Sequence, residues 1–429
     1  MDKLVRGGLV VSMDPAVGTL PRADVLIEDG RIAAIGPDLD AAGAEVVDAS
    51  GKIVMPGFVD THRHTWQTAF RGLGADWTFG QYRVAVHGTL GPHYRPEDVY
   101  LGNLLGRIEA LNSGVTTLLD WFHRADRPEN ADAAIQALGD APGRSIFCYG
   151  AAGPDIAPEI RRVRALLAGE DMALGLRGPV MSTLDETTAD VALARELDLR
   201  MSVHVHGTGG WPRGDRPLAW MHEQGLLGDR TTVVHGNGLS DDQLAMLADV
   251  GGSVSVSPDV ELKMGFEPLI TGRALAAGIR PSLSVDDCPS AGGDMFSAMR
   301  TALAAERGAL TTRDVLSFAT VDGARTCGLG ARTGSITVGK DADLVLLDAE
   351  DPAVFPVGDA IGTIVSAGHP GLVDSVFVAG EAVKRDGRLL GLDLPALRAR
   401  LLESRDRIAA AAGVPVDGSW QPQEADVTR

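Results

Sequence analysis

Two pairs of alternating histidines are the residues in this chain that are best spaced for chemistry. His62 and His64 lie in the stretch "VDTHRH", and His204 and His206 lie in "MSVHVHG". Residues two apart on a β-strand point to the same face, so each pair presents two imidazoles together. Neutral imidazole binds divalent metals well, and His62 and His64 are therefore predicted to share one metal ion.

Three further residues of suitable type each end an apolar, strand-like run. They are His206, His235 in "VVHGNGLS" and Asp286 in "LSVDD". Metal-ligating and acid–base side chains converge in this way when parallel strands end at one edge of a sheet. The pattern therefore predicts a metal centre rather than a set of structural histidines.

The segment that must position these residues alternates between strands and helices. Eight apolar runs recur between residues 56 and 335, with helix-patterned segments such as 96–112, 186–198 and 240–249 between them. This alternation is typical of a (β/α)8 barrel, in which the active site lies at the carboxyl ends of the strands.

Both ends of the chain instead show short strands separated by turns, as in "ADVLIEDGRIAAIGP" and "VDSVFVAGEAVKRDGRLLG". We predict one small β-sandwich domain built from residues 1–55 and 336–392, around a barrel of residues 56–335. Residues 393–429 are expected to form a C-terminal helix and tail.

Composition excludes several classes of function. The chain of 429 residues has 58 acidic and 39 basic side chains, a net charge of −19 that disfavours nucleic-acid binding. Its three cysteines form no CxxC pair, which argues against disulfides and cysteine zinc sites. No run approaches the ~18 apolar residues of a membrane span. We expect a cytoplasmic enzyme that acts on a small molecule, with neither nucleic acid nor a membrane as partner.

Several motifs together resemble those of the amidohydrolase superfamily. They are "MPGFVDTHRH", "VHVHG", "VVHGNGLS", "VSPDVELKMG", "LSVDD" and "GSITVGKDADLVLLD". The match is to the branch of cytosine-deaminase-like, guanine-deaminase-like and triazine-hydrolase-like enzymes, and it extends to about residue 390. The resemblance implies a barrel fold and a homodimer or larger homo-oligomer.

The same resemblance implies the roles of the site residues. The metal ligands would be His62, His64, His206 and Asp286, with Asp286 as general base and His235 polarising the substrate. Members with two metals bridge them by a carboxylated lysine after the fourth strand, where this chain has Arg177 in "LGLRGPV". We therefore expect one divalent metal per chain, Zn²⁺ with Fe²⁺ as the alternative.

One position departs from the pattern of the related deaminases, in which a glutamate follows the fifth-strand histidine by three residues. Gly209 stands there if His206 is the ligand, and Gly207 if His204 is the ligand. We favour His206 and place His204 beside the substrate.

Five residues are expected to face the substrate, although for some of them loop packing is an equally good interpretation: Trp66, Gln67, His123, His204 and Trp211. His87, His93, His222 and His369 are expected to be surface or packing residues.

These features predict a mononuclear metal-dependent hydrolase. It would attack a C–N bond of a small cyclic, heteroaromatic nitrogen compound with metal-bound hydroxide, as a deaminase does. Because Gly209 replaces the glutamate, an alternative is that the same site opens a lactam or amide, or catalyses decarboxylation or isomerisation. A third alternative is a catalytically inactive assembly subunit, which the presence of all four ligands disfavours.

Overall fold

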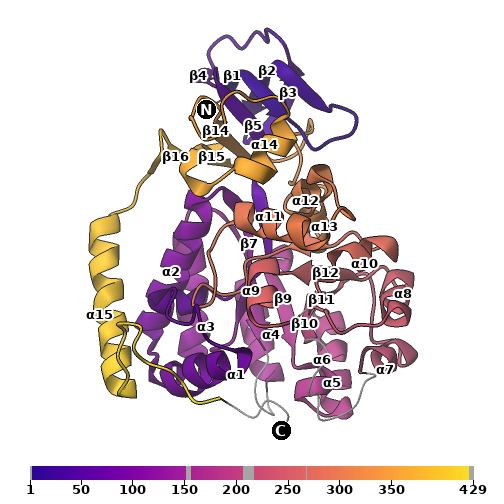
Figure 1. Cartoon of the computed structure of the whole chain (residues 1–429), viewed down its shortest axis with the longest axis vertical. Helices are drawn as coiled ribbons and strands as arrows, with labels where there is room; N and C mark the ends of the chain where they lie inside the picture. Colours follow the sequence, from indigo (N-terminus) through magenta and orange to yellow (C-terminus); the bar gives the residue numbers. More distant parts are fainter. Residues whose placement is uncertain (1, 151–155, 206–216, 267, 425–429) are drawn as a thin grey trace.

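The computed structural model describes residues 2–150, 156–205, 217–266 and 268–424. Its centre is a barrel of eight parallel strands, with helices packed around the outside (Figure 1). Neighbouring strands in the barrel are also neighbours in the sequence, which confirms the predicted (β/α)8 topology. The strands are β6 (Phe58–Arg63), β7 (Val115–Phe122), β8 (Arg144–Gly150), β9 (Met172–Leu176), β10 (Arg200–Val205), β11 (Thr231–His235), β12 (Ser253–Val256) and β13 (Ser282–Leu283).

Backbone hydrogen bonds between the segment after β13 and the end of β6 close the barrel. The Asp286 amide donates to the His62 carbonyl at 3.0 Å, and the His64 amide donates to the Asp286 carbonyl at 2.9 Å. Three proposed site residues are thus fixed to one another by the main chain, whatever their side chains bind.

Helices cover the barrel, and several begin at the capping boxes that their sequences contain. Thr183 with Glu186 caps α6, and Ser240 with Gln243 caps α8. The helices that follow barrel strands or pack beside them are α1 (Phe79–Tyr82), α2 (Pro96–Asn112), α3 (Pro128–Asp140), α4 (Ala157–Leu166), α5 (Gly178–Met181), α6 (Leu184–Glu196), α7 (Pro217–Glu223), α8 (Asp241–Asp249), α9 (Pro258–Lys263), α10 (Thr271–Ala276), α11 (Met295–Ala305), α12 (Thr312–Phe318) and α13 (Val321–Thr326).

The second sheet is built from both ends of the chain, as predicted. It has nine strands, and β5 from the N-terminal part pairs with β14 from the C-terminal part, Met55 opposite Val345. Its strands are β1 (Lys3–Val11), β2 (Thr19–Glu28), β3 (Arg31–Gly36), β4 (Glu45–Asp48), β5 (Lys52–Pro56), β14 (Leu344–Asp348), β15 (Val373–Val378), β16 (Glu381–Arg385) and β17 (Arg388–Leu389), with helix α14 (Ala360–Ala367) beside them. Because β5 leads directly into β6, this sheet anchors the strand that carries His62.

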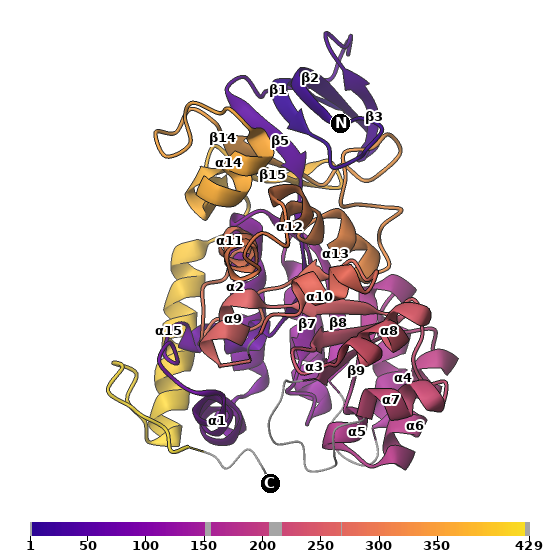
Figure 2. The same ribbon diagram turned by 45° about the vertical axis from the view of Figure 1, so that its right-hand side comes forward.

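The last helix, α15 (Leu394–Ala412), lies along α2 at the side of the barrel in both views (Figures 1 and 2). None of the helices in the described ranges combines the length and the apolar composition that a membrane span requires.

Candidate metal centre

His62, His64 and Asp286 meet at the carboxyl end of the barrel. The Asp286 Oδ1 atom lies 3.4 Å from His62 Nε2 and 3.1 Å from His64 Nε2. All three side chains are buried, with at most 8% of any one exposed. The structure thus brings together three of the four ligands that the resemblance implied.

The fifth barrel strand contributes His204. Its Nε2 atom lies 3.2 Å from His62 Nε2, and the nitrogens of His62, His64 and His204 all lie within 4.8 Å of one another. His206, the ligand that we favoured from the sequence, lies outside the described residues, as do Gly207 and Gly209. Among the described residues, His204 is therefore the histidine of β10 that reaches the cluster.

The protonation of the cluster suits a cation. The His64 Nδ1–H donates to the Trp121 carbonyl at 2.6 Å, which orients the ring so that Nε2 faces Asp286 Oδ1. Burial, together with the nearby His64, lowers the pKa of His62 to about 3, so this ring is neutral. Three imidazole nitrogens and one carboxylate oxygen are a donor set that fits zinc or a similar divalent ion.

Two of the site residues have an uncommon backbone conformation. His235 has φ +68° and Asp286 has φ +66°, a left-handed region that non-glycine residues seldom occupy. Such a residue costs roughly 1–3 kcal/mol and persists where the surrounding structure fixes it. His235 is the last residue of β11 and Asp286 lies three residues after β13, and the bend at each lets its side chain turn toward the cluster.

His235 is held by a buried carboxylate that sequence reasoning missed. Its Nδ1 donates to Glu261 Oε1 at 3.0 Å, and its Nε2 lies 3.9 Å from Asp286 Oδ2. Glu261 is fully buried and also accepts from the Ser257 amide at 2.7 Å and from Asn237 Nδ2 at 2.9 Å. The signal was present in "VSPDVELKMG", but nothing in the spacing linked Glu261 to His235.

Electrostatics favour the charged form of His235. Burial alone would lower its pKa, but the hydrogen bond to Glu261 and the charge of Asp286 outweigh burial and raise the pKa above its ordinary value. An imidazolium has a donor on both ring nitrogens, so His235 can bond to Glu261 and still donate from Nε2.

We expect Glu261→Gln to lower turnover about 10- to 100-fold, the usual effect of losing a carboxylate that supports a site histidine. Without the carboxylate, the pKa of His235 falls and the donor form is lost at a lower pH. The high-pH limb of the pH–rate profile should therefore move to lower pH.

The control for that experiment is Asp259→Asn, on the same helix, because Asp259 bonds to Thr301 rather than to His235. An unchanged pH profile in Glu261→Gln would contradict the role given to Glu261.

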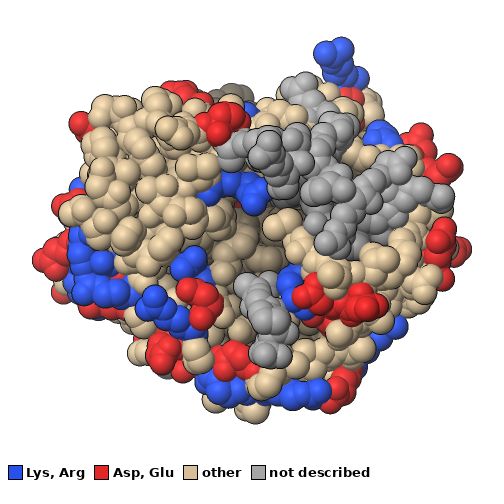
Figure 3. Space-filling model, turned by 90° about the horizontal axis from the view of Figure 1, so that it is seen from below, with Lys and Arg blue, Asp and Glu red and all other residues tan. Residues whose placement is uncertain are grey.

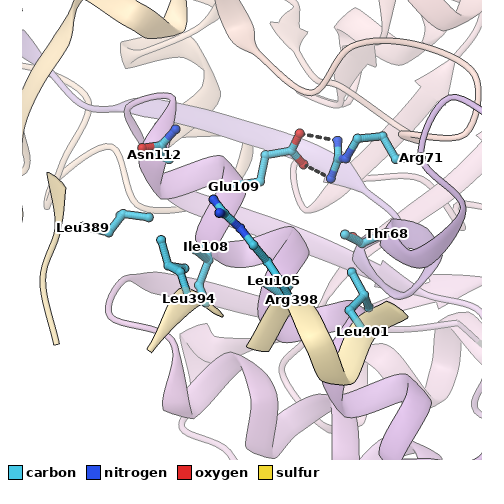
Figure 4. A pocket seen from close by; sticks show the side chains of 10 residues that line it. All are labelled: Thr68, Arg71, Leu105, Ile108, Glu109, Asn112, Leu389, Leu394, Arg398 and Leu401. Atoms are coloured by element: carbon cyan, nitrogen blue, oxygen red, sulfur yellow. Dashed lines mark hydrogen bonds and ion pairs between the residues drawn. The ribbon is translucent and has the colours of Figure 1, made fainter. Parts of the chain in front are cut away.

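Ion pairs hold the end of β6, where Arg63 lies between His62 and His64. Arg63, between His62 and His64, donates from Nη2 to Glu109 Oε2 of α2 at 2.7 Å. Glu109 also pairs with Arg71, in the wall of a groove between α2 and α15 (Figure 4). The ion pair with Glu109 turns the Arg63 side chain away from the metal centre.

An indole forms one side of the cluster. The ring centroid of Trp121 lies 4.4 Å from that of His204 and 4.7 Å from that of His123. A Cβ added at Gly150 or Gly175 would come within 2.6 Å of the indole, so these strand-end glycines make the room for it. The two glycines of β8 and β9 thus allow a large flat ring beside the metal centre.

Of the predicted substrate contacts, His123 lies beside the cluster, with its ring centroid 4.1 Å from that of His64. Burial lowers its pKa, and its buried Nδ1 has no hydrogen-bond partner among the described residues. His87, which we expected to be a packing residue, lies next to it at 4.7 Å between ring centroids. His87 also packs against Trp66 and Tyr82, which fits the packing role expected for it, and substrate contact by His123 stays a prediction.

Trp66 and Gln67 are buried in the wall behind this region. Gln67 Nε2 donates to the Tyr82 hydroxyl at 2.7 Å, and the Trp66 ring packs edge-on against Tyr94 at 5.0 Å. Contact of these two residues with substrate stays a prediction. Trp211 lies outside the described residues.

Arg177 occupies the position of the bridging lysine but turns elsewhere. Its guanidinium pairs with Asp190 of α6 at 2.8 Å and with Glu186 at 3.3 Å. An arginine bound to these carboxylates supplies no bridging ligand, which supports the expectation of one metal.

The face opposite the terminal sheet is hollowed near its centre, with Lys and Arg side chains among those at the rim (Figure 3).

Comparisons with known proteins agree with this geometry. The profile of the amidohydrolase family matches residues 53–383. The chain is 31% identical to a 5-methylthioadenosine/S-adenosylhomocysteine deaminase of Desulforudis audaxviator, over 92% of this chain and 96% of the relative. It is 27% identical to a 5'-deoxyadenosine deaminase of Methanosarcina mazei, over 91% of this chain and 95% of the relative.

A solved structure is similar over the whole length. An adenosine deaminase from Xanthomonas campestris with bound zinc superposes with a TM-score of 0.86 at 27% identity, covering 95% of this chain and 99% of that one.

Proposed function

The chain belongs to the amidohydrolase family, and from that premise we propose that it is a mononuclear zinc deaminase of small adenine nucleosides. Its family and its deaminase relatives make it a metal-dependent hydrolase of a heteroaromatic C–N bond. The observation that carries the proposal is the convergence of His62, His64 and His204 nitrogens with the Asp286 carboxylate. The nucleoside substrate is suggested by the names of the relatives.

In the proposed ligand set, His204 replaces His206. His62, His64 and His204 would bind the ion through Nε2, and Asp286 through a carboxylate oxygen. When bound, the cation acts as a Lewis acid that lowers the pKa of a coordinated water toward ~7.

The chain's own residues would move the protons. The Asp286 carboxylate accepts a proton from the attacking water and can pass it to the departing amino group. His235 donates a hydrogen bond from Nε2 to the negative charge that develops on the attacked ring, and Glu261 keeps His235 in the donor form. Trp121 offers a flat apolar face beside the reacting centre.

The absence of a glutamate after the fifth-strand histidine favours a second candidate function, the opening of an amide or lactam. With His204 as ligand, Gly207 stands where the related deaminases have a glutamate, so this chain lacks the residue that protonates the ring in those enzymes. Opening of an amide or lactam needs a proton only at the departing nitrogen, which Asp286 can supply.

The test is ammonia release by the zinc-loaded protein. Adenosine, 5'-deoxyadenosine, methylthioadenosine and S-adenosylhomocysteine are assayed beside guanine, cytosine, triazines and simple lactams. The proposal expects ammonia from at least one adenine nucleoside. Ring opening of a lactam with no ammonia from any purine would overturn it in favour of the second candidate.

We expect one equivalent of tightly bound metal per chain, because Arg177 is engaged by Asp190 and Glu186 instead of bridging two ions. Elemental analysis of fully active protein checks this, with zinc and iron measured together to identify the ion. Two equivalents in fully active protein would contradict it.

We keep two sequence-based expectations as predictions, cytoplasmic location and assembly into a homodimer or larger homo-oligomer. Light scattering at assay concentration should give at least twice the mass of one chain.

A further inference from the structure

The C-terminal helix is tied to the barrel near the start of α2. Ser404 Oγ donates to Asp98 Oδ1 at 2.6 Å, and Arg407 pairs with the same carboxylate. Leu394 and Leu401 of α15 face Leu105 and Ile108 of α2 across the groove shown in Figure 4. The helix ends at Gly413, whose φ of +70° turns the chain.

Beyond Gly413 the chain crosses to residues 77–81, at the start of the short helix α1, and contacts them in three different ways. The Trp420 ring packs edge-on against Trp77, with 5.3 Å between ring centroids. Gln81 Nε2 donates to the Pro422 carbonyl at 3.1 Å. The Thr78 hydroxyl donates to the Glu424 carboxylate at 2.8 Å.

Helix α1 carries aromatic side chains toward the metal centre. The Tyr82 hydroxyl bonds to Gln67, and its ring lies 5.5 Å from that of His87, the neighbour of His123. The Phe79 ring lies 5.1 Å from that of Phe266.

Phe266 in turn lies 5.9 Å from the ring of His235. Phe79 and Phe266 are only partly buried. A shift of α1 would therefore move Tyr82 relative to His87 and Phe79 relative to Phe266, and both contacts lead to site histidines.

Helix α1 is the first turn of a longer helical segment, since Tyr82 leads directly into the π-helix Arg83–Leu90. Residues at the start of a helix have unsatisfied backbone groups, so this first turn depends more than the interior on contacts with its neighbours. The tail supplies contacts from the outer side, while Gln67 and Phe266 supply contacts from the inner side.

We propose that Trp420, Pro422 and Glu424, in the tail after α15, are positioning residues of the active site, which hold α1 so that Phe79 and Tyr82 form a wall of the substrate pocket. The proposed metal ligands lie on barrel strands or within three residues after them, and none of the tail contacts with residues 77–81 involves these ligands. Loss of the tail therefore weakens substrate binding and leaves metal binding intact. The effect on substrate rests on the proposed function, whereas the effect on α1 does not.

The experiment compares the full chain with a chain that ends at Gly413 and with Trp420→Ala. Hydrogen–deuterium exchange of peptides spanning residues 65–82 reports on α1 without any substrate. Metal content and the KM and kcat for methylthioadenosine are measured on the same preparations. Controls are a chain that ends at Glu424 and the variant Ser419→Ala, since the Ser419 side chain bonds within the tail to Asp417.

We expect faster exchange in residues 65–82, unchanged metal content, and a KM raised about tenfold with kcat changed less than about threefold. Trp420→Phe should restore most of the KM, because it keeps an aromatic ring against Trp77. If the shortened chain does not fold, Glu424→Ala removes only the bond to Thr78 and should still speed exchange of α1.

Unchanged exchange and KM in the shortened chain would overturn the proposal, as would loss of metal, which would show a general structural role. A third outcome is that exchange in α1 becomes faster in the shortened chain but the full chain does not turn over methylthioadenosine. That outcome would refute methylthioadenosine as a substrate and would still support the coupling of the tail to α1.

Discussion

Asp286→Asn is expected to lower kcat by about 10³-fold or more while the fold is kept, on the scale of removing a general base. Burial would raise the pKa of the Asp286 carboxyl, but hydrogen bonds with His62 and His64 hold it well below its ordinary value. Asp286 is therefore an ionised acceptor at neutral pH. The amide of asparagine has nearly the same shape but cannot take a proton from water.

The measurement combines kcat, metal content and thermal unfolding of the same protein. The matched control is Asp294→Asn, in the same segment, where Asp294 caps α11 and asparagine caps about equally well. The control should keep its turnover. An Asp286→Asn protein with bound metal and near-normal turnover would show that another residue is the base.

His204→Ala is expected to lose the metal and at least about 10³-fold in turnover, since a catalytic ion contributes several kcal/mol to the transition state. His204 Nε2 lies 3.2 Å from His62 Nε2, so its removal takes away one of three converging nitrogens. The melting temperature should also fall, because metal bound only by the folded state stabilises that state.

His206→Ala is the matched comparison, two residues further along the sequence. It should keep its metal, and its turnover should change far less than that of His204→Ala. The opposite result, metal lost with His206→Ala and kept with His204→Ala, would restore the ligand set that the sequence favoured. Metal kept by both variants would refute a ligand from β10.

The barrel and the first histidine pair were predictable because both depend on local periodicity. Alternation of apolar residues in each strand, and helical patterns between strands, make the eightfold repeat visible without any long-range contact. The spacing of His62 and His64 likewise determines that they share a face. Helix starts such as Ser240 with Gln243 are equally local.

Which histidine of "VHVH" reaches the metal was not predictable in this way. His204 and His206 have the same parity, so the two-residue period cannot choose between them. The register of β10 against its neighbour, with His204 opposite Val234 and Val205 opposite His235, brings His204 to the cluster, whereas His206 lies outside the described residues. Strand register is set by contacts with other strands, and these are absent from the sequence pattern of β10 alone.

By itself, the sequence determined the class of fold, the family, and a metal centre at the ends of the barrel strands. Only the tertiary structure decided which side chains far apart in the sequence bond to one another. Glu261 bonds to a histidine 26 residues away, and the Glu424 carboxylate accepts from a threonine 346 residues away. Periodicity shows which face of a helix or strand a residue occupies. Its hydrogen-bond partner on that face comes from another chain segment, and the two segments meet only when the chain folds.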